Sequence, residues 1–214
     1  MANNYDKIAN QYDTLSRLIY GKAQVNAQIN QLKYIPENSV ILIVGGGTGW
    51  ILEEIAKVQP SGLKMVYVEI SEKMIKLSKA RNLQDNSVTF VNIAIEDFNS
   101  NLKFDIIITP FLFDNFNSAR VKTVFRKLHS LLKENGLWFL VDFSLSDKKG
   151  KLWKWLMLKS MYAFFNLLNI VEASKLVDIM PYFLAKEYKI FEERFYYNRF
   201  IRASILKKNN RSEP

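Results

Sequence analysis

Five short apolar runs, each bounded by turn residues, alternate with amphipathic stretches along the chain. The first run, Val40–Val44, is β-branched and uninterrupted, as expected for a central strand that is covered on both faces. The other four runs are 64–70, 88–93, 104–109 and 137–143. Such alternation is typical of βα units that build a parallel sheet, so it restricts the fold to the α/β class.

Helical spacing of apolar residues between the runs predicts helices over 48–58, 72–81 and 118–133. Two further β-type runs, 187–190 and 200–206, predict a C-terminal antiparallel hairpin. We therefore expect a Rossmann-like, doubly wound, mostly parallel sheet of about seven strands, with the hairpin at its end.

Composition excludes several kinds of site. The chain has no cysteine and one histidine, which leaves no thiolate chemistry and too few ligands for a zinc site, so we expect no metal. The polar N-terminal segment, Met1 to Asp13, has no apolar leader, which predicts a cytoplasmic protein. The formal charge of +9 comes from scattered lysines, so we expect a basic surface rather than a nucleic-acid site.

A glycine-rich loop directly follows the first strand, with glycines at Gly45, Gly46, Gly47 and Gly49. Without a Cβ, a glycine backbone can approach a ligand closely and present its N–H groups at a helix N-terminus. About twenty residues further on, Glu69 stands near the end of the second strand, where a carboxylate can accept hydrogen bonds from both hydroxyls of a ribose. The loop and the acid together predict a nucleoside-containing ligand.

The spacing of the glycines distinguishes two kinds of cofactor. In the dinucleotide motif G-x-G-x-x-G the third glycine lets a helix approach the pyrophosphate, but here that position is Trp50. In the segments GGGTG, Glu69 and VEISEKMIKLSKA the chain resembles the class I S-adenosylmethionine-dependent methyltransferases. From Tyr5 to Phe143, including YDKIANQYD and LLKENGLWFLVDF, it resembles the branch that includes the ubiquinone/menaquinone C-methyltransferases.

The resemblance implies S-adenosylmethionine as the cofactor and assigns residues to its parts. The methionine part would be lined by Gly45, Gly47 and Gly49, with Gly46, Thr48 and Thr109 also in the cofactor site. Glu69 would hold the ribose, and Ile70 and Met74 would flank the adenine, although Met74 fits ordinary core packing equally well. The Ile95 backbone and the Glu96 or Asp97 side chain would meet the adenine edge.

The acceptor is expected beyond the carboxyl ends of the strands, beside the segment 109–116 (TPFLFDNF). Its aromatic residues favour a small, apolar or aromatic acceptor, with core packing as the alternative. Asp114 is the candidate catalytic acid of this segment, with a helix cap as the alternative. Tyr12, in the N-terminal segment that folds over the cofactor in the resembled branch, is the second catalytic and cofactor-binding candidate.

Two departures from the family pattern and the absence of one motif bear on the alternative functions. Ile43 and Ala94 stand where the family commonly has acids, so a non-catalytic module that binds S-adenosylmethionine or S-adenosylhomocysteine is the first alternative. RNA or DNA methylation is disfavoured, because Thr109-Pro110-Phe111 lacks the Asn/Asp-Pro-Pro-aromatic pattern of the base methyltransferases.

A dense aromatic and aliphatic stretch over 152–171 contains Lys154 and Lys159, which make it too polar to span a bilayer. We expect a helical lid over the acceptor pocket, with these lysines keeping its outer face in water; a dimer partner or a membrane surface is the alternative. The chain then forms one domain, with an N-terminal helical cap (1–35), a cofactor-binding core (38–145), the lid (148–180) and C-terminal strands (182–207).

Overall fold

The computed structural model describes residues 6, 9, 12–147, 150–167 and 173–209, except for the side chains of Tyr12, Asp13, Leu15 and Ser16. The strands are β1 (Val40–Val44), β2 (Ser61–Val68), β3 (Asp85–Val91), β4 (Phe104–Pro110), β5 (Leu132–Phe143), β6 (Lys189–Tyr196) and β7 (Ile201–Lys207). The helices are α1 (Tyr12–Tyr20), α2 (Ala23–Leu32), α3 (Trp50–Val58), α4 (Glu72–Lys79), α5 (Ser118–Leu131), α6 (Lys151–Leu167) and α7 (Met180–Leu184), with a short 3-10 helix, η1 (Phe113–Asn115), after β4.

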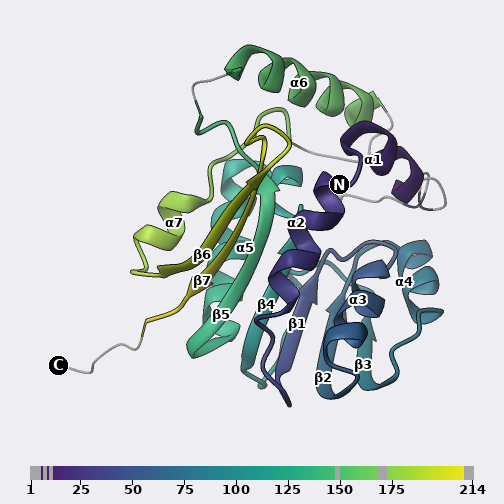
Figure 1. Ribbon diagram of the computed structural model, residues 1–214. Coiled ribbons are helices and arrows are strands. Elements are labelled where there is room, and N and C mark those ends of the chain that lie inside the picture. The colour runs from purple at the N-terminus through teal and green to yellow at the C-terminus, as the bar shows by residue number, and fades with distance from the viewer. Residues whose placement is uncertain (1–5, 7–8, 10–11, 148–149, 168–172, 210–214) are drawn as a thin grey trace.

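The strands form a seven-stranded sheet in the order β3-β2-β1-β4-β5-β7-β6 (Figure 1). The strands β3, β2, β1, β4 and β5 pair in parallel, whereas β7 runs antiparallel to both β5 and β6. The predicted fold class and the C-terminal hairpin are therefore confirmed. Because β1 pairs with β2 on one side and β4 on the other, the strand order reverses there, and ligands bind beyond the carboxyl ends of strands at such a point.

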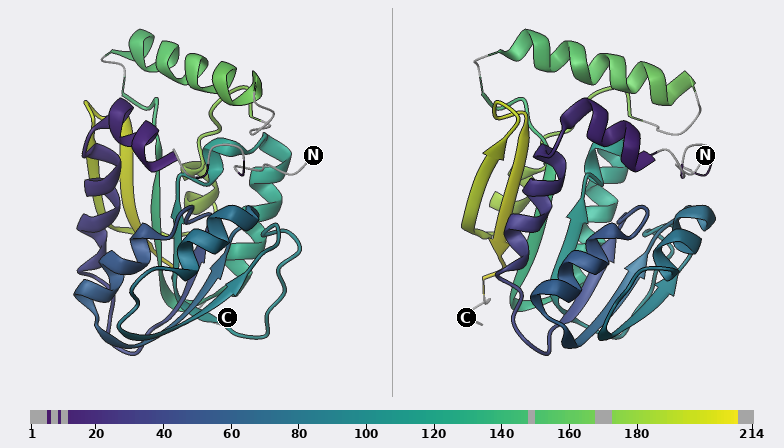
Figure 2. Two further views of the ribbon diagram at one scale, coloured as in Figure 1. Left: turned by 90° about the vertical axis from the view of Figure 1, so that its right-hand side faces the viewer. Right: turned by 45° about the vertical axis from the view of Figure 1, so that its right-hand side comes forward.

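Strand β1 shows why both faces of the sheet are apolar. Its side chains alternate, so Ile41 and Ile43 pack in a cluster with α2 and α3, whereas Leu42 and Val44 pack in a cluster with α5 and α7. All four side chains are buried. The uninterrupted apolar run is thus explained by helices on both faces, which Figure 2 shows in two views.

Some boundaries differ from the expected ones. Strand β2 ends at Val68 rather than at residue 70, so Glu69 and Ile70 lie in the connection that follows it. That connection ends at Ser71, whose hydroxyl oxygen accepts a hydrogen bond from the Met74 N–H (3.1 Å) and caps α4. In the hairpin, β6 begins two residues later than the expected run 187–190 and extends six residues further, because pairing with β7 stabilises its polar end as well, whereas β7 is shifted by one residue from 200–206.

Helix α6 lies across the carboxyl ends of the strands, with α1 beside it (Figures 1 and 2). The Tyr20 hydroxyl donates a hydrogen bond to Met161 Sδ (3.6 Å) and links the two helices. The prediction that both lysines keep the outer face wet is wrong for Lys154, which is fully buried with its Nζ 4.0 Å from Asp147 Oδ2. The reason is helical phase: Lys154 shares a face with buried Leu158 four residues further on.

None of the helices in the described part of the chain has the length and hydropathy needed to cross a bilayer.

Candidate active site

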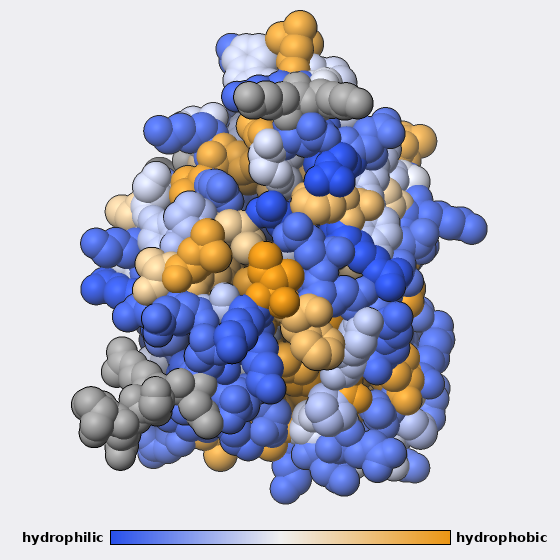
Figure 3. Space-filling model, turned by 60° about the vertical axis from the view of Figure 1, so that its left-hand side comes forward, coloured by the Kyte–Doolittle hydropathy of each residue, from blue (hydrophilic) through white to orange (hydrophobic). Residues whose placement is uncertain are grey.

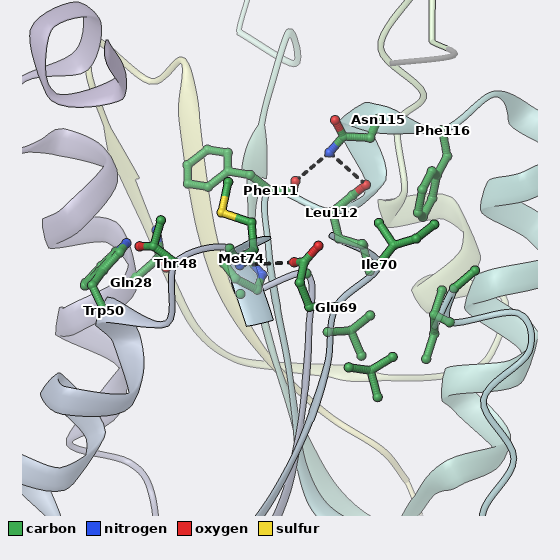
Figure 4. A pocket seen from close by; sticks show the side chains of 18 of the residues that line it. Gln28, Thr48, Trp50, Glu69, Ile70, Met74, Phe111, Leu112, Asn115 and Phe116 are labelled. Atoms are coloured by element: carbon green, nitrogen blue, oxygen red, sulfur yellow. Dashed lines mark hydrogen bonds between the residues drawn. The ribbon is translucent and has the colours of Figure 1, made fainter. Parts of the chain in front are cut away.

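A cavity lies at the carboxyl ends of β1, β2 and β4, and the empty space in and in front of it, open solvent included, is about 1070 Å³. That is the switch point of the sheet, where open α/β folds bind their ligands. Figure 4 shows Gln28, Thr48 and Trp50 on one side, Ile70, Leu112 and Phe116 on the other, and Glu69 between them. One cavity therefore joins the glycine loop, the acid after β2 and the segment after β4.

The glycine loop needs its glycines for separate reasons. Gly45 and Gly47 have φ values of 69° and 63°, which side chains seldom adopt. A Cβ on Gly46 would lie 2.6 Å from the Tyr67 ring, so this glycine makes room for a buried aromatic side chain. The Tyr67 hydroxyl in turn donates a hydrogen bond to the Gly47 carbonyl (2.8 Å) and holds the loop in place.

Gly47 and Gly49 differ in what surrounds them. A Cβ on Gly47 would meet no atom within 4 Å, because this residue borders the cavity. A Cβ on Gly49 would lie 2.7 Å from Ser78 Cα, because α3 and α4 approach each other closely here. The first glycine leaves room for a ligand and the second for a neighbouring helix.

The Glu69 carboxylate lies at the base of the cavity and is 6% exposed. Its Oε2 accepts a hydrogen bond from the Gly47 N–H (3.2 Å), and its Oε1 accepts one from the Ser71 N–H (3.0 Å). Burial raises the pKa of Glu69 to about 7, although these backbone hydrogen bonds act in the opposite direction. A third backbone hydrogen bond comes from Ile70, and the carboxylate still borders the cavity, where ligand hydroxyls can donate to it.

Beside Glu69 the cavity wall is apolar. Ile70, Met74 and Ile95 line it together with Leu112 and Phe116. Such side chains fit the flat faces of an aromatic ring.

The acid expected at the adenine edge lies outside this wall. The Glu96 carboxylate forms an ion pair with the Arg120 guanidinium, in which Nη2 and Oε2 are 3.3 Å apart. Arg120 itself lines the cavity and lies over the Phe116 ring, 4.2 Å from its centroid. The structure therefore brings Arg120, rather than Glu96, to the cavity surface.

Phe111, at the acceptor end, has a left-handed backbone with φ of 49°. A bulky residue in this region is strained by about 1–3 kcal/mol and needs surrounding contacts to hold it. Here the Phe111 N–H donates to the Val141 carbonyl (2.7 Å), and Asn115 Nδ2 donates to the Phe111 carbonyl (2.8 Å). The strained residue lines the cavity, and the sequence gives no sign of it.

Asp114 is buried next to the cavity but is absent from its lining. Burial, and then the nearby charge of Asp142, raises the pKa of Asp114 well above its usual range. Asp142, also buried, accepts a hydrogen bond from the Phe143 N–H (2.8 Å) and further ones from the backbone at the start of η1. Asp142 thus holds the segment 111–116, to which Asp114 itself belongs, through the backbone of η1.

The remaining candidates lie at the edge of the site or outside it. Thr48 lines the cavity, but its carbonyl and hydroxyl accept hydrogen bonds from Arg81 Nε (3.0 Å) and Nη2 (3.3 Å). Thr109 is buried below the cavity and accepts a hydrogen bond from Trp138 Nε1 (2.9 Å). Tyr12 begins α1, and its side chain lies outside the described residues.

Sequence reasoning missed the contribution of α2 to the cavity. Gln24, Val25 and Gln28 line it from this helix, and Arg17 lines it from α1. A signal was present, because Gln24, Gln28 and Gln31 recur at positions i, i+4 and i+7 and so share one helix face. Glutamine on a face turned toward a sheet needs polar partners, which a ligand can supply.

The described residues hold no group of three acidic, histidine or cysteine side chains that could bind a metal ion. They do fit S-adenosylmethionine in two respects. The space beside Gly47 admits ligand atoms where a side chain would otherwise stand, and the Glu69 carboxylate, a hydrogen-bond acceptor that borders the cavity, suits a ribose diol.

Known proteins share this architecture. The sequence model of the family described as methyltransferase domain matches residues 42–138. A ubiquinone/menaquinone biosynthesis C-methyltransferase of Geotalea daltonii is 26% identical over 176 residues, which cover 76% of this chain and 68% of that protein.

Two solved structures show the same fold at low sequence identity. The structure of a mitomycin 7-O-methyltransferase matches with a TM-score of 0.65 and 11% identity, covering 94% of this chain but only 60% of that longer protein. The 1,6-didemethyltoxoflavin N1-methyltransferase of Burkholderia thailandensis, with its substrate and S-adenosylhomocysteine bound, matches with a TM-score of 0.59 and 12% identity, covering 96% and 86%.

The family match over residues 42–138, the curated relative, the strand order and the glycine loop with its acid support a class I S-adenosylmethionine-dependent methyltransferase.

Proposed function

We propose that the chain transfers the methyl group of S-adenosylmethionine to a small, largely apolar or aromatic molecule. The observation that carries this proposal is the apolar end of the cavity, where Phe111, Leu112 and Phe116 continue from the pocket around Glu69. An acceptor in contact with these side chains would lie next to the cofactor. The mitomycin and toxoflavin methyltransferases, which have the same fold, are named for small-molecule substrates and are consistent with this class of acceptor.

We assign the cofactor contacts as follows. The Glu69 carboxylate accepts hydrogen bonds from the ribose hydroxyls, and the backbone of Gly45 and Gly47 borders the methionine part. Ile70 and Met74 pack against the adenine. When bound, the cofactor supplies a methyl group already activated on a sulfonium centre, so positioning of the acceptor can provide much of the rate.

We assign Asp114 a positioning role instead of contact with the acceptor. Its Oδ1 accepts a hydrogen bond from Asn115 Nδ2 (3.0 Å), and its backbone carbonyl accepts one from the Tyr162 hydroxyl of α6 (3.1 Å). These bonds join the segment 111–116 to the helix above it. Asp114 thereby fixes the wall on which the acceptor packs.

The test is a transfer assay with methyl-labelled S-adenosylmethionine and a panel of small aromatic and aliphatic acceptors. We expect label in at least one apolar product, and a large loss of transfer in Phe111→Ala with cofactor affinity retained. Phe191→Ala is the matched control, because Phe191 is exposed on β6 away from the cavity. Cofactor binding without transfer to any acceptor would favour the non-catalytic binding module instead.

A further inference from the structure

The outer face of α6 exposes five large apolar side chains. Leu152, Trp155, Leu156, Phe164 and Leu167 are between 44% and 81% exposed. In Figure 3 an orange, hydrophobic side chain projects at the top of the molecule among paler and blue ones. A cluster of this kind on a single helix marks a surface that contacts something else.

Helical phase separates this face from the packed one. Leu152, Leu156 and Leu167 stand at positions i, i+4 and i+15, which fall on one side of a helix with about 3.6 residues per turn. Buried Lys154 and Leu158 stand on the opposite side, against the body of the protein. The exposed residues are therefore not part of the core, and their apolar character needs a separate explanation.

The charges of α6 are all positive. The helix sequence, KLWKWLMLKSMYAFFNL, contains no acidic residue. Lys159 lies on the exposed face, with its Nζ 4.6 Å from the centroid of the Trp155 ring. Lys151 begins the helix and is also exposed, and Lys148 and Lys149 precede it in the sequence. A tryptophan, leucines and lysines on one exposed face are typical of helices that lie in a membrane interface.

Helix α1 extends the same surface. Its Leu18 and Ile19 are 81% and 42% exposed, and the bond from Tyr20 to Met161 places this end of α1 beside α6. Figure 2 shows both helices at the end of the molecule where the strands of the parallel sheet terminate. Arg17 of α1 lines the cavity, so the apolar surface lies close to the cavity mouth.

We propose that α6 and the end of α1 bind the surface of an anionic membrane. The apolar side chains enter the boundary between headgroups and acyl chains, and Lys151 and Lys159 contact anionic headgroups. Charge favours this occupant over a second copy of the chain, because two such lysine-bearing faces on a protein with a net charge of +9 would repel each other. The inference is independent of which acceptor is methylated.

The experiment is co-sedimentation of the full chain with vesicles of phosphatidylcholine alone and of phosphatidylcholine mixed with phosphatidylglycerol. We expect binding to the mixed vesicles that weakens with added salt, since screening reduces the attraction. Trp155→Glu should lower the partition coefficient by about tenfold or more, because it removes apolar burial and adds an opposing charge. Lys159→Gln should lower it by about fivefold.

Leu102→Glu is the matched control, because Leu102 is also exposed but precedes β4, at the opposite end of the sheet. It should bind vesicles like the unaltered protein, and cofactor affinity should be the same in all variants if they are folded. No binding to anionic vesicles, or equal loss in Leu102→Glu, would overturn the proposal. So would a dimer in solution that Trp155→Glu dissociates, because a second copy would then cover the face.

Discussion

The Glu69 carboxylate accepts a hydrogen bond from the backbone N–H of Gly47 at 3.2 Å. The acid that follows β2 and the glycine loop that follows β1 are therefore one unit, although 22 residues separate them. The bond orients the carboxylate toward the cavity and fixes the most ligand-accessible glycine of the loop.

Removing the Glu69 carboxylate should weaken the binding of the cofactor without unfolding the protein. We expect Glu69→Ala to lower the affinity for S-adenosylmethionine by about 1.5–3 kcal/mol, the range for hydrogen bonds to a charged group. Titration calorimetry measures this directly. Glu72→Ala, which alters an exposed acid on α4, should leave the affinity unchanged, and an equal effect in both variants would contradict the ribose assignment.

Cofactor affinity should depend on pH through Glu69. Its pKa is raised to about 7 in the folded chain, so the carboxylate that accepts two hydroxyl hydrogen bonds is lost as the pH falls through this value. We expect affinity to be constant well above pH 7 and to fall by up to about tenfold per pH unit below it. Glu69→Gln should bind the cofactor more weakly, with an affinity that does not change with pH. A pH-independent affinity in the unaltered protein would contradict the assignment of Glu69 to the ribose.

Substitutions at two glycines of the loop should have different effects, one on the stability of the fold and the other on cofactor binding. Gly49→Ala should destabilise the fold by about 2–4 kcal/mol, because its Cβ would meet Ser78 and its backbone has φ of 77°. Gly47→Ala should cost only the backbone strain of about 1–2 kcal/mol but should lose cofactor affinity. Urea denaturation and calorimetry on both variants give the comparison, and retained affinity in folded Gly47→Ala would remove Gly47 from the site.

The glycine loop and Glu69 could be predicted because each depends on a few adjacent residues that follow a strand. The strands could be predicted for the same reason, because a local apolar run such as Val40–Val44 indicates a strand that is buried on both faces. Their ends were less predictable, and Glu69 lies just after β2 because pairing with neighbouring strands, rather than hydrophobicity, decides where a strand stops.

Other parts of the site depend on contacts between distant segments. Glu96 is paired by Arg120, which comes from α5, and no local pattern indicates this partner. Gln24 and Gln28 reach the cavity because α2 packs against α3 and across β5, β6 and β7. The left-handed backbone of Phe111 arises from its hydrogen bonds with Val141 and Asn115, which a propensity argument does not include.

The buried pair Asp114 and Asp142 should make stability depend on pH. Both carboxyls have pKa values raised above those of the unfolded chain, so the folded state keeps protons that the unfolded state loses. The free energy of unfolding should then decrease as the pH rises from about 4 through the raised pKa values. Asp114→Asn should make this decrease shallower, as measured by urea denaturation at a series of pH values.

Asp97→Asn is the matched control, because Asp97 is exposed. Its stability profile should follow that of the unaltered protein. If Asp114→Asn had the same profile as this control, the two buried carboxyls would not be titrating as a pair.

The most direct test of the account is a crystal structure of the protein with S-adenosylhomocysteine. We predict density in the cavity between α2 and η1, with both ribose hydroxyls at hydrogen-bonding distance from the Glu69 carboxylate. The adenine should pack between Ile70 and Leu112, and the methionine part should lie along Gly45 and Gly47. Density for the ligand elsewhere, or a ribose that points away from Glu69, would contradict the account.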